Sequence, residues 1–297
     1  MLAKKIDIHT HVTMWPDTAP RLRNSDHTLM NVENQLKKWD EINVQHGVLL
    51  PLVSLEARRV LITPEECHWI ASQHPDRFSW FCSIDPRCER NLPDSDLSCL
   101  IEHYKSLGAK GVGEITSNLY ADDPKMDNMF YHCAACDMPV LIHIAPKPEG
   151  YYGIVDDPGL PRIEKMLKKH PNLKLIGHSA AFWSEIGEYD LAQRNGYPKG
   201  KVIEGRIPKL MREYENLYCD LSAGSGSNAM MRDPEYAASF LTEFADRIYF
   251  GCDLCSTTDT YQIEFSNFLQ NLADTGAISQ DVFRKICWDN AAKLLGL

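Results

Sequence analysis

Two histidines near the start of the chain are spaced to bind one ion. His9 and His11 lie two residues apart in the β-rich run 4–11. Side chains alternate across a strand, so both imidazoles should point to the same side. Each imidazole offers a nitrogen lone pair that suits a divalent metal ion. Two buried core histidines would give the same pattern, so the pair needs support from elsewhere in the sequence.

That support comes from the ends of four later β-rich runs, where Glu114, His143, His178 and Asp253 stand. Burying so many ionisable groups together would be unfavourable without a cation between them. We therefore expect a centre for one or two divalent ions, with these metal ligands: His9, His11, Glu114, His143, His178 and Asp253. Imidazole and carboxylate donors favour Zn²⁺, with Mn²⁺, Fe²⁺ or Co²⁺ as alternatives.

The elements that must position these ligands recur along the whole chain. Amphipathic, helical stretches such as 32–44, 160–170 and 202–214 separate short β-rich runs. The eight runs are 4–11, 46–53, 77–84, 109–115, 139–144, 173–179, 216–222 and 247–253. This alternation predicts an α/β fold, a (β/α)8 TIM barrel, with residues 1–297 as a single domain. An open doubly wound sheet is the alternative, but the first run is not followed by the glycine-rich phosphate loop typical of that fold.

The composition narrows the choice of partners and location. The chain of 297 residues has 31 Lys and Arg against 41 Asp and Glu, a net charge of −10. This charge repels phosphate backbones, so we expect no nucleic acid partner. No apolar run approaches the roughly 20 residues that span a bilayer, and the N-terminus does not resemble a signal peptide. We expect a cytoplasmic protein without membrane contact. Its ten cysteines should be free thiols, as is usual in a reducing compartment. A homo-oligomer is compatible with the sequence.

The order of the expected ligands resembles the amidohydrolase superfamily of metal-dependent TIM-barrel enzymes. The stretches PNLKLIGHSAAFW and DRIYFGCD resemble its amidohydrolase-related branch, which includes hydrolases, lactonases and non-oxidative decarboxylases, and the resemblance covers the whole chain. It implies that His9, His11 and Asp253 hold one ion and that His143 and His178 hold a second.

The fourth strand departs from many binuclear members, which bridge their ions with a carboxylated lysine. Here Glu114 stands on that strand, similar to the bridging glutamate of TatD-type deoxyribonucleases. In mononuclear relatives the histidine matching His143 joins the first ion, and the one matching His178 orients water or substrate. The resemblance therefore leaves one ion or two.

The expected activity is hydrolysis of an ester, lactone or amide bond of a small molecule by a metal-activated water. Asp253 and His178 are the expected catalytic residues: Asp253 transfers the water proton and His178 stabilises the oxyanion. The alternative on the same fold is non-oxidative decarboxylation, or hydration, of an unsaturated or aromatic acid. Glu114 also suggests phosphoester or DNA hydrolysis, which the net charge opposes. A non-catalytic barrel that binds metal or ligand is the remaining alternative.

Some residues carry weaker signals. Asp7 is either a hydrogen-bond acceptor for a ligand histidine or a buried cap, and Asp220 is a second potential partner of the site. The small residues of 222–232 form either an anion-binding loop or a tight turn. An anionic substrate could bind Lys147 or Arg232.

The aromatic residues expected near a substrate pocket are Trp15, Tyr151, Tyr152, Phe182 and Trp183. Among the other histidines, His27 is the one most able to reach this pocket.

Overall fold

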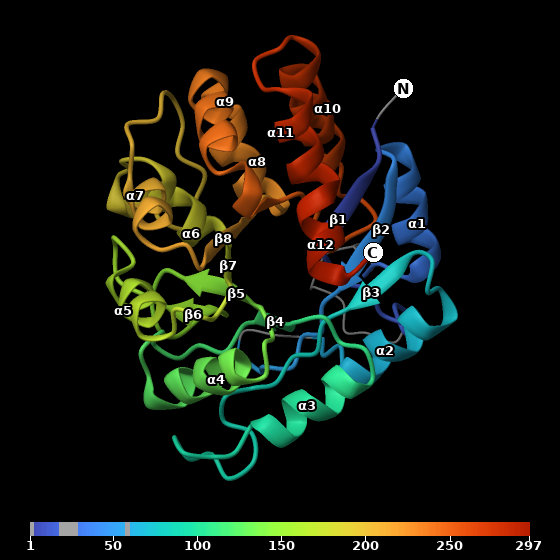
Figure 1. Cartoon of the computed structure of the whole chain (residues 1–297), viewed down its shortest axis with the longest axis vertical. Coiled ribbons are helices and arrows are strands. Elements are labelled where there is room, and N and C mark those ends of the chain that lie inside the picture. Colours follow the sequence, from blue (N-terminus) through green and yellow to red (C-terminus); the bar gives the residue numbers. More distant parts are fainter. Residues whose placement is uncertain (1–2, 18–28, 57–59) are drawn as a thin grey trace.

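The computed structural model describes residues 3–17, 29–56 and 60–297, and its strands form a ring of parallel neighbours (Figure 1). One part of the ring is β1 (Lys5–Thr10), β2 (Val44–Leu49) and β3 (Phe78–Trp80). The other part is β4 (Val112–Ile115), β5 (Val140–Ala145), β7 (Leu175–His178), β8 (Leu217–Asp220) and β9 (Ile248–Tyr249). A short strand, β6 (Ile154–Val155), pairs with the end of β5 outside this order.

Backbone hydrogen bonds join the two parts of the ring at both ends. Next to β3, the Cys82 N–H donates to the Gly111 carbonyl over 2.9 Å. Beside β1, the Ile8 N–H donates to the Phe250 carbonyl over 3.0 Å, and the Asp253 N–H donates to the His9 carbonyl over 2.8 Å. The described strands therefore close into the parallel barrel that the sequence predicts.

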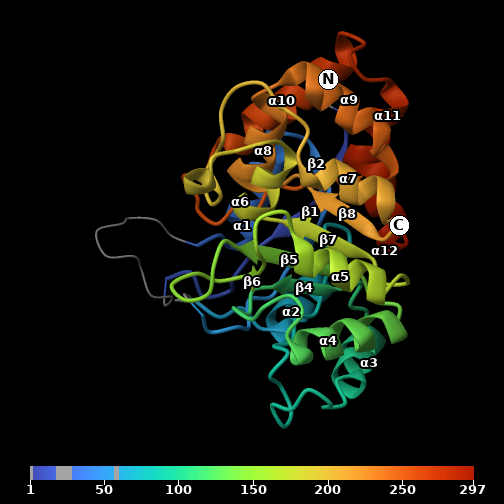
Figure 2. The same cartoon turned by 90° about the vertical axis from the view of Figure 1, so that its left-hand side faces the viewer.

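Helices surround the barrel, as the two views in Figures 1 and 2 show. Their bounds are α1 (Val32–Glu41), α2 (Pro64–Gln73), α3 (Ser98–Ser106), α4 (Pro124–Ala135), α5 (Pro161–Lys169), α6 (Ala180–Trp183), α7 (Arg206–Glu213), α8 (Ala223–Met231), α9 (Pro234–Glu243), α10 (Tyr261–Asp274), α11 (Gln280–Arg284) and α12 (Asn290–Leu295). The first residues of α2, α4 and α9 are prolines that follow a capping side chain, from Thr63, Asp123 and Asp233 respectively. This pairing suits a helix start, where a cap satisfies a free N–H and proline lacks one.

The hydrophobic core has two parts. An inner cluster fills the barrel below the site and packs against α12; it comprises Ile6, Ile8, Val48, Leu50, Phe81, Leu141, Ile176, Tyr249, Ala291, Ala292 and Leu295. A larger cluster, including Trp39, Phe130 and Phe240, lies between the strands and the surrounding helices. The apolar interior fills the barrel below the C-terminal ends of the strands, where the candidate metal ligands gather.

One sequence expectation, for the stretch 222–232, differs from the structure. Residues 222–232 are neither an anion-binding loop nor a tight turn, because Ala223–Met231 form α8. A Cβ on Gly226 would lie 2.2 Å from the Leu221 carbonyl oxygen, so the small residues of α8 allow close packing. The π-helical turn η4 (Lys285–Asp289) joins α11 to α12 in one unbroken helical segment. No helix in the described ranges has the length and apolar character needed to cross a membrane.

Candidate metal centre

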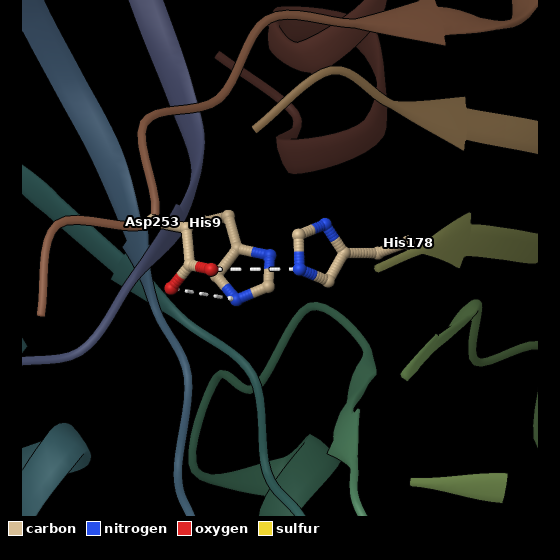
Figure 3. A group of neighbouring side chains, drawn as sticks. All are labelled: His9, His178 and Asp253. Atoms are coloured by element: carbon tan, nitrogen blue, oxygen red, sulfur yellow. Dashed lines mark ion pairs between the residues drawn. The ribbon is translucent and has the colours of Figure 1, made fainter. Parts of the chain in front are cut away.

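The C-terminal ends of β1, β4, β5, β7 and β9 bring the six expected ligands together. They are His9, His11, Glu114, His143, His178 and Asp253, and their donor atoms form three overlapping groups, each within 4.8 Å. His9, His11, Glu114 and His178 are buried, whereas 15% of the His143 side chain and 16% of the Asp253 side chain are exposed. Figure 3 shows the Asp253 carboxylate facing the imidazoles of His9 and His178, with one oxygen directed at each ring. The site is therefore buried toward the barrel interior and reaches solvent at His143 and Asp253.

Four donor atoms have the spacing expected around a single ion. His9 Nε2 and His11 Nε2 are 3.0 Å apart, and Asp253 Oδ1 lies 3.5 and 3.6 Å from them. Glu114 Oε2 lies 3.9 Å from His9 Nε2 and 3.4 Å from His11 Nε2. Four ligands at about 2.0–2.2 Å from a tetrahedral zinc ion would lie roughly 3.3–3.6 Å from one another. This donor set fits a divalent ion.

The same two carboxylates also face the remaining histidines. Glu114 Oε1 lies 2.7 Å from His143 Nδ1, and Asp253 Oδ2 lies 3.4 Å from His178 Nε2. The His143 and His178 rings are 5.4 Å apart between centroids. Each carboxylate thus presents one oxygen to His9 and His11 and the other to a second histidine, which is the arrangement needed to bridge two ions.

Hydrogen bonds on the far side of the imidazoles fix their orientation. His9 Nδ1 lies 2.6 Å from Asp220 Oδ2, which is also 3.3 Å from His178 Nδ1. His178 Nδ1 lies 3.0 Å from Ser222 Oγ, and His11 Nδ1 lies 2.9 Å from the Leu50 carbonyl oxygen. An imidazole that donates from Nδ1 keeps the Nε2 lone pair for a metal ion. Asp220 is therefore a shared support for His9 and His178.

The model of the amidohydrolase family matches residues 6–297 of the sequence. The chain belongs to the amidohydrolase family. Its expected fold, a TIM barrel of this family, is confirmed. It is therefore a member of an enzyme family, and one that is typically metal-dependent.

Solved structures with the same fold share little sequence with it. An uncharacterised TIM-barrel protein from Bordetella bronchiseptica has a TM-score of 0.64, 16% identity and 99% coverage of both chains. The 5-carboxyvanillate decarboxylase from Sphingomonas paucimobilis has a TM-score of 0.65, 16% identity and 99% coverage of both chains. A candidate 2-pyrone-4,6-dicarboxylic acid hydrolase from Pseudomonas putida has a TM-score of 0.62, 15% identity and coverage of 98% of this chain and 97% of that one. No curated protein sequence matches at a significant level.

The electrostatics of this family member show how strongly the acids and imidazoles interact without an ion. Burial lowers the pKa of His178, but hydrogen bonds with Asp220 and Asp253 outweigh this effect and raise the pKa to about 10. Burial raises the pKa of Glu114, but the charge on His143 and hydrogen bonds from His11 and His143 hold it well below its ordinary value. Without an ion, these interactions favour the ionised form of Glu114 and the protonated form of His178.

We expect metal affinity to rise with pH. A metal ion needs the neutral form of His178, whose pKa is raised to about 10 without an ion, so the ion must displace a proton. The fraction of neutral imidazole grows as pH approaches that value, and the competition weakens. Zinc affinity measured against a chelator at several values from about pH 6 to about pH 9 should increase steadily, with proton release detected by a pH indicator. A zinc affinity independent of pH would contradict the protonation of His178 in the absence of an ion.

We also expect Asp220→Asn to weaken metal binding by about 10- to 100-fold, because supporting hydrogen bonds tune ligand orientation and basicity. The substitution removes the charge that lies 2.6 Å from His9 Nδ1 and 3.3 Å from His178 Nδ1. Chelator competition at fixed pH measures the change. Asp274→Asn, on the exposed end of α10, is the matched control and should leave affinity unchanged. An Asp220→Asn protein that folds and binds metal like the parent would contradict the supporting role.

Asp7 is a buried cap, the second of its two expected roles. Its carboxylate accepts hydrogen bonds from Trp39 Nε1 over 2.8 Å, from the Cys252 N–H over 2.8 Å and from the His9 backbone N–H over 3.0 Å. The register of β1 against β2 is irregular between Asp7 and Thr10. This irregularity directs Asp7 toward α1, whereas a regular strand would place its side chain on the same face as His9.

The expected pocket residues divide into lining and core residues. Tyr151 and Tyr152 line the cavity beside the metal-ligand cluster, whereas Phe182 and Trp183 are buried core residues. Among the described residues, neither Lys147 nor Arg232 lines this cavity, and Trp15 does not line it either. His27 lies outside the described residues.

Other residues of the site are less apparent in the sequence. Ser222 contacts His178, and two more tyrosines line the cavity: Tyr197 from a loop and Tyr261 from the first residue of α10. Ser222 stands two residues after Asp220, and residues two apart in a strand point to the same face. This spacing could have predicted that Ser222 lies near the site. Neither tyrosine has such a signal, because the course of the preceding loop decides where Tyr197 and the start of α10 lie.

Proposed function

We propose that this chain holds one or two divalent ions, Zn²⁺ being the first choice, and hydrolyses an ester, lactone or amide bond of a small molecule. The observation that carries this proposal is the position of Asp253. Its carboxylate lies within 3.6 Å of His9, His11 and His178 and also lines a cavity large enough for a small molecule. A proton-accepting group thus stands between the metal-ligand cluster and the space for substrate.

The roles of the residues follow from this position. His9, His11 and Asp253 would hold the first ion and His143 and His178 the second, with Glu114 between them. When bound, such ions activate water and polarise a carbonyl group. Asp253 accepts the water proton through Oδ2, the oxygen nearer His178, and delivers it to the leaving group. In the one-ion form of the centre, His178 Nε2 would not bind an ion and would instead stabilise negative charge on the substrate oxygen, beside Asp253 Oδ2 at 3.4 Å.

Decarboxylation is the second candidate function. Two structural matches are decarboxylases: the 5-carboxyvanillate enzyme described above and the 2,6-dihydroxybenzoate decarboxylase from Rhizobium, which has 16% identity and a TM-score of 0.54. The same donor set could bind the carboxylate of an aromatic acid, with Asp253 donating a proton to the ring carbon. This candidate uses the same residues and differs in its product.

A screen of protein reconstituted with Zn²⁺, Mn²⁺, Fe²⁺ or Co²⁺ tests both functions. The substrates are lactones, aryl esters, N-acyl compounds, aromatic carboxylates and phosphodiesters. Release of acid from a lactone or ester supports hydrolysis, whereas carbon dioxide from an aromatic acid supports decarboxylation. Turnover confined to phosphodiesters, or no turnover with any metal, would contradict both proposals.

We also propose that the protein works in the cytoplasm. All ten cysteines are free thiols, and Cys255 is exposed beside the site. Free thiols are typical of reducing compartments. Fractionation of cells that express the tagged full chain tests this location, and recovery in an extracellular or membrane fraction would contradict it.

A further inference from the structure

A second cavity lies at the N-terminal end of the barrel, opposite the metal-ligand cluster. This N-terminal cavity has a volume of about 420 Å³, equal to that of the cavity beside the metal ligands. Its lining comes from the N-terminal sides of β7 and β8, from β9 and the preceding turn η3 (Ala245–Arg247), and from η4 and α12. The described lining includes none of the candidate metal ligands, so a molecule bound here would not contact the metal centre.

The acids of the N-terminal cavity already have cationic partners. The charged residues of its lining are Lys174, Lys285, Lys293, Asp246 and Asp289. Asp246 Oδ1 lies 2.9 Å from Lys285 Nζ. Asp289 Oδ2 lies 2.7 Å from Nε of Arg284, which is not part of the lining. These two ion pairs neutralise both acids and one of the three lysines.

The other two lysines keep their charges uncompensated. The Nζ atoms of Lys174 and Lys293 take part in no ion pair or hydrogen bond within the described residues. Both residues are exposed, so an anion can reach them from solvent. The chain as a whole has a net charge of −10, and a cavity with a positive balance is therefore a local departure from its composition. Such a local positive potential attracts small anions.

Two tyrosine hydroxyls of the same cavity also lack partners. Tyr218 and Tyr249 line the cavity with ring centroids 5.9 Å apart and planes 20° apart. Only 3% of Tyr249 is exposed, and its ring belongs to the inner apolar cluster, yet neither hydroxyl has a hydrogen-bond partner among the described residues. Burial raises the pKa of both tyrosines, so both hydroxyls keep their protons at neutral pH and can donate. Buried polar groups are nearly always hydrogen-bonded, and a molecule in the cavity can supply the acceptor.

We propose that the N-terminal cavity binds the phosphate group of a small phosphorylated molecule, with Lys174 and Lys293 pairing with its oxygens and the hydroxyls of Tyr218 and Tyr249 donating hydrogen bonds to them. A phosphate monoester carries a charge of about −1.5 to −2 at neutral pH and has three acceptor oxygens. Two uncompensated ammonium groups match this charge, whereas a carboxylate would compensate only one. The cavity is larger than a phosphate group, which leaves room for the rest of the molecule beside Leu294 and the tyrosine rings.

This site is independent of the proposed hydrolysis, because the two cavities lie at opposite ends of the barrel. Calorimetric titration of phenyl phosphate, inorganic phosphate and benzoate into the zinc-loaded full-length protein tests the ligand chemistry. Phenyl phosphate should bind at least about fivefold more tightly than benzoate, because only the phosphate group can pair with both lysines. Tighter binding of phenyl phosphate than of inorganic phosphate would assign a phosphorylated molecule, and the reverse order would assign the free ion. Benzoate binding as tight as that of phenyl phosphate would overturn the proposal.

A double variant separates this site from the metal centre, which can also attract an anion. Lys174→Gln/Lys293→Gln should weaken phenyl phosphate binding by at least about tenfold, since it removes two charged hydrogen-bond donors. Lys209→Gln, an exposed lysine of α7 outside the cavity lining, is the matched control and should leave the affinity unchanged. Unchanged binding in the double variant would place phenyl phosphate at the metal centre and overturn the proposal.

Two single variants test the site from opposite directions. Asp246→Asn removes an acid of the lining and frees Lys285, so phenyl phosphate should bind about threefold more tightly. A folding defect cannot produce tighter binding, so this result would not depend on the stability of the variant. Tyr249→Phe removes only the hydroxyl and should weaken binding by about fivefold, the effect of one net hydrogen bond. Weaker binding in Asp246→Asn, or unchanged binding in Tyr249→Phe, would contradict the proposed contacts.

Discussion

Replacing Asp253 by asparagine should lower kcat by about 10²- to 10⁴-fold, the range expected when a general acid–base group is lost. An amide cannot accept the water proton, yet it keeps the size of the carboxylate and one oxygen that can bind an ion. Asp253 has a left-handed backbone with φ 53°, a conformation that asparagine also tolerates. KM should change less than kcat, because proton transfer acts mainly in the transition state. Steady-state kinetics on the best substrate from the metal screen provides the measurement.

Metal content must be measured on the same samples, because Asp253 is also a proposed ligand. Asp246→Asn is the matched control: this acid pairs with Lys285 at the opposite end of the barrel, and 76% of its side chain is exposed. An Asp253→Asn protein that retains its metal and turns over within about threefold of the parent would exclude Asp253 as the proton carrier. Loss of metal together with activity, restored by excess zinc, would reduce its role to that of a ligand.

The fold was predictable because its signal repeats. The β-rich runs are mostly buried, and the strands of the barrel fall within or at the edge of the expected runs, whereas the short β6 (Ile154–Val155) lies outside all of them. Regular strand pairing is short in the run 247–253, where β9 covers only Ile248–Tyr249. The chain nevertheless stays in the barrel wall beyond β9, because the Asp253 N–H donates to the His9 carbonyl at the C-terminal end of the barrel. The ends of barrel strands meet at one place, so strand position alone predicts which polar side chains converge.

The details that escaped prediction depend on tertiary contacts. The register irregularity between Asp7 and Thr10 is one of two in β1, and it lets Asp7 face Trp39; the periodicity of the sequence does not predict such a shift. The glycine- and serine-rich stretch of α8 has poor intrinsic helix propensity, so packing must stabilise that helix. Tyr197 reaches the cavity through a loop whose course depends on its neighbours. The convergence of the candidate ligands at the strand ends was thus predictable, whereas of the tyrosines that line the cavity beside the metal ligands Tyr151 and Tyr152 were expected and Tyr197 was not.

Glu114→Gln should reduce the zinc content at saturation from two ions per chain to one. Glu114 Oε1 lies 2.7 Å from His143 Nδ1, and Oε2 lies 3.4 Å from His11 Nε2, so each oxygen faces a different pair of histidines. A glutamine has one oxygen and one NH₂ group, and the NH₂ group has no lone pair to offer an ion. The change therefore removes one of the two bridging contacts while preserving side-chain volume in this buried position. Elemental analysis after zinc saturation and desalting measures the stoichiometry.

The outcome separates the two forms of the centre that the amidohydrolase family allows. Glu235→Gln is the matched control, because 87% of this side chain is exposed and its partner is the exposed Lys201. Two ions in the parent and in Glu235→Gln, with one in Glu114→Gln, would support a carboxylate-bridged pair. One ion in all three proteins would contradict the bridge, and Glu114 would then serve to hold His143 through their 2.7 Å contact. In that case the first ion would still have His9, His11 and Asp253, whose mutual spacing of 3.0–3.6 Å does not depend on Glu114.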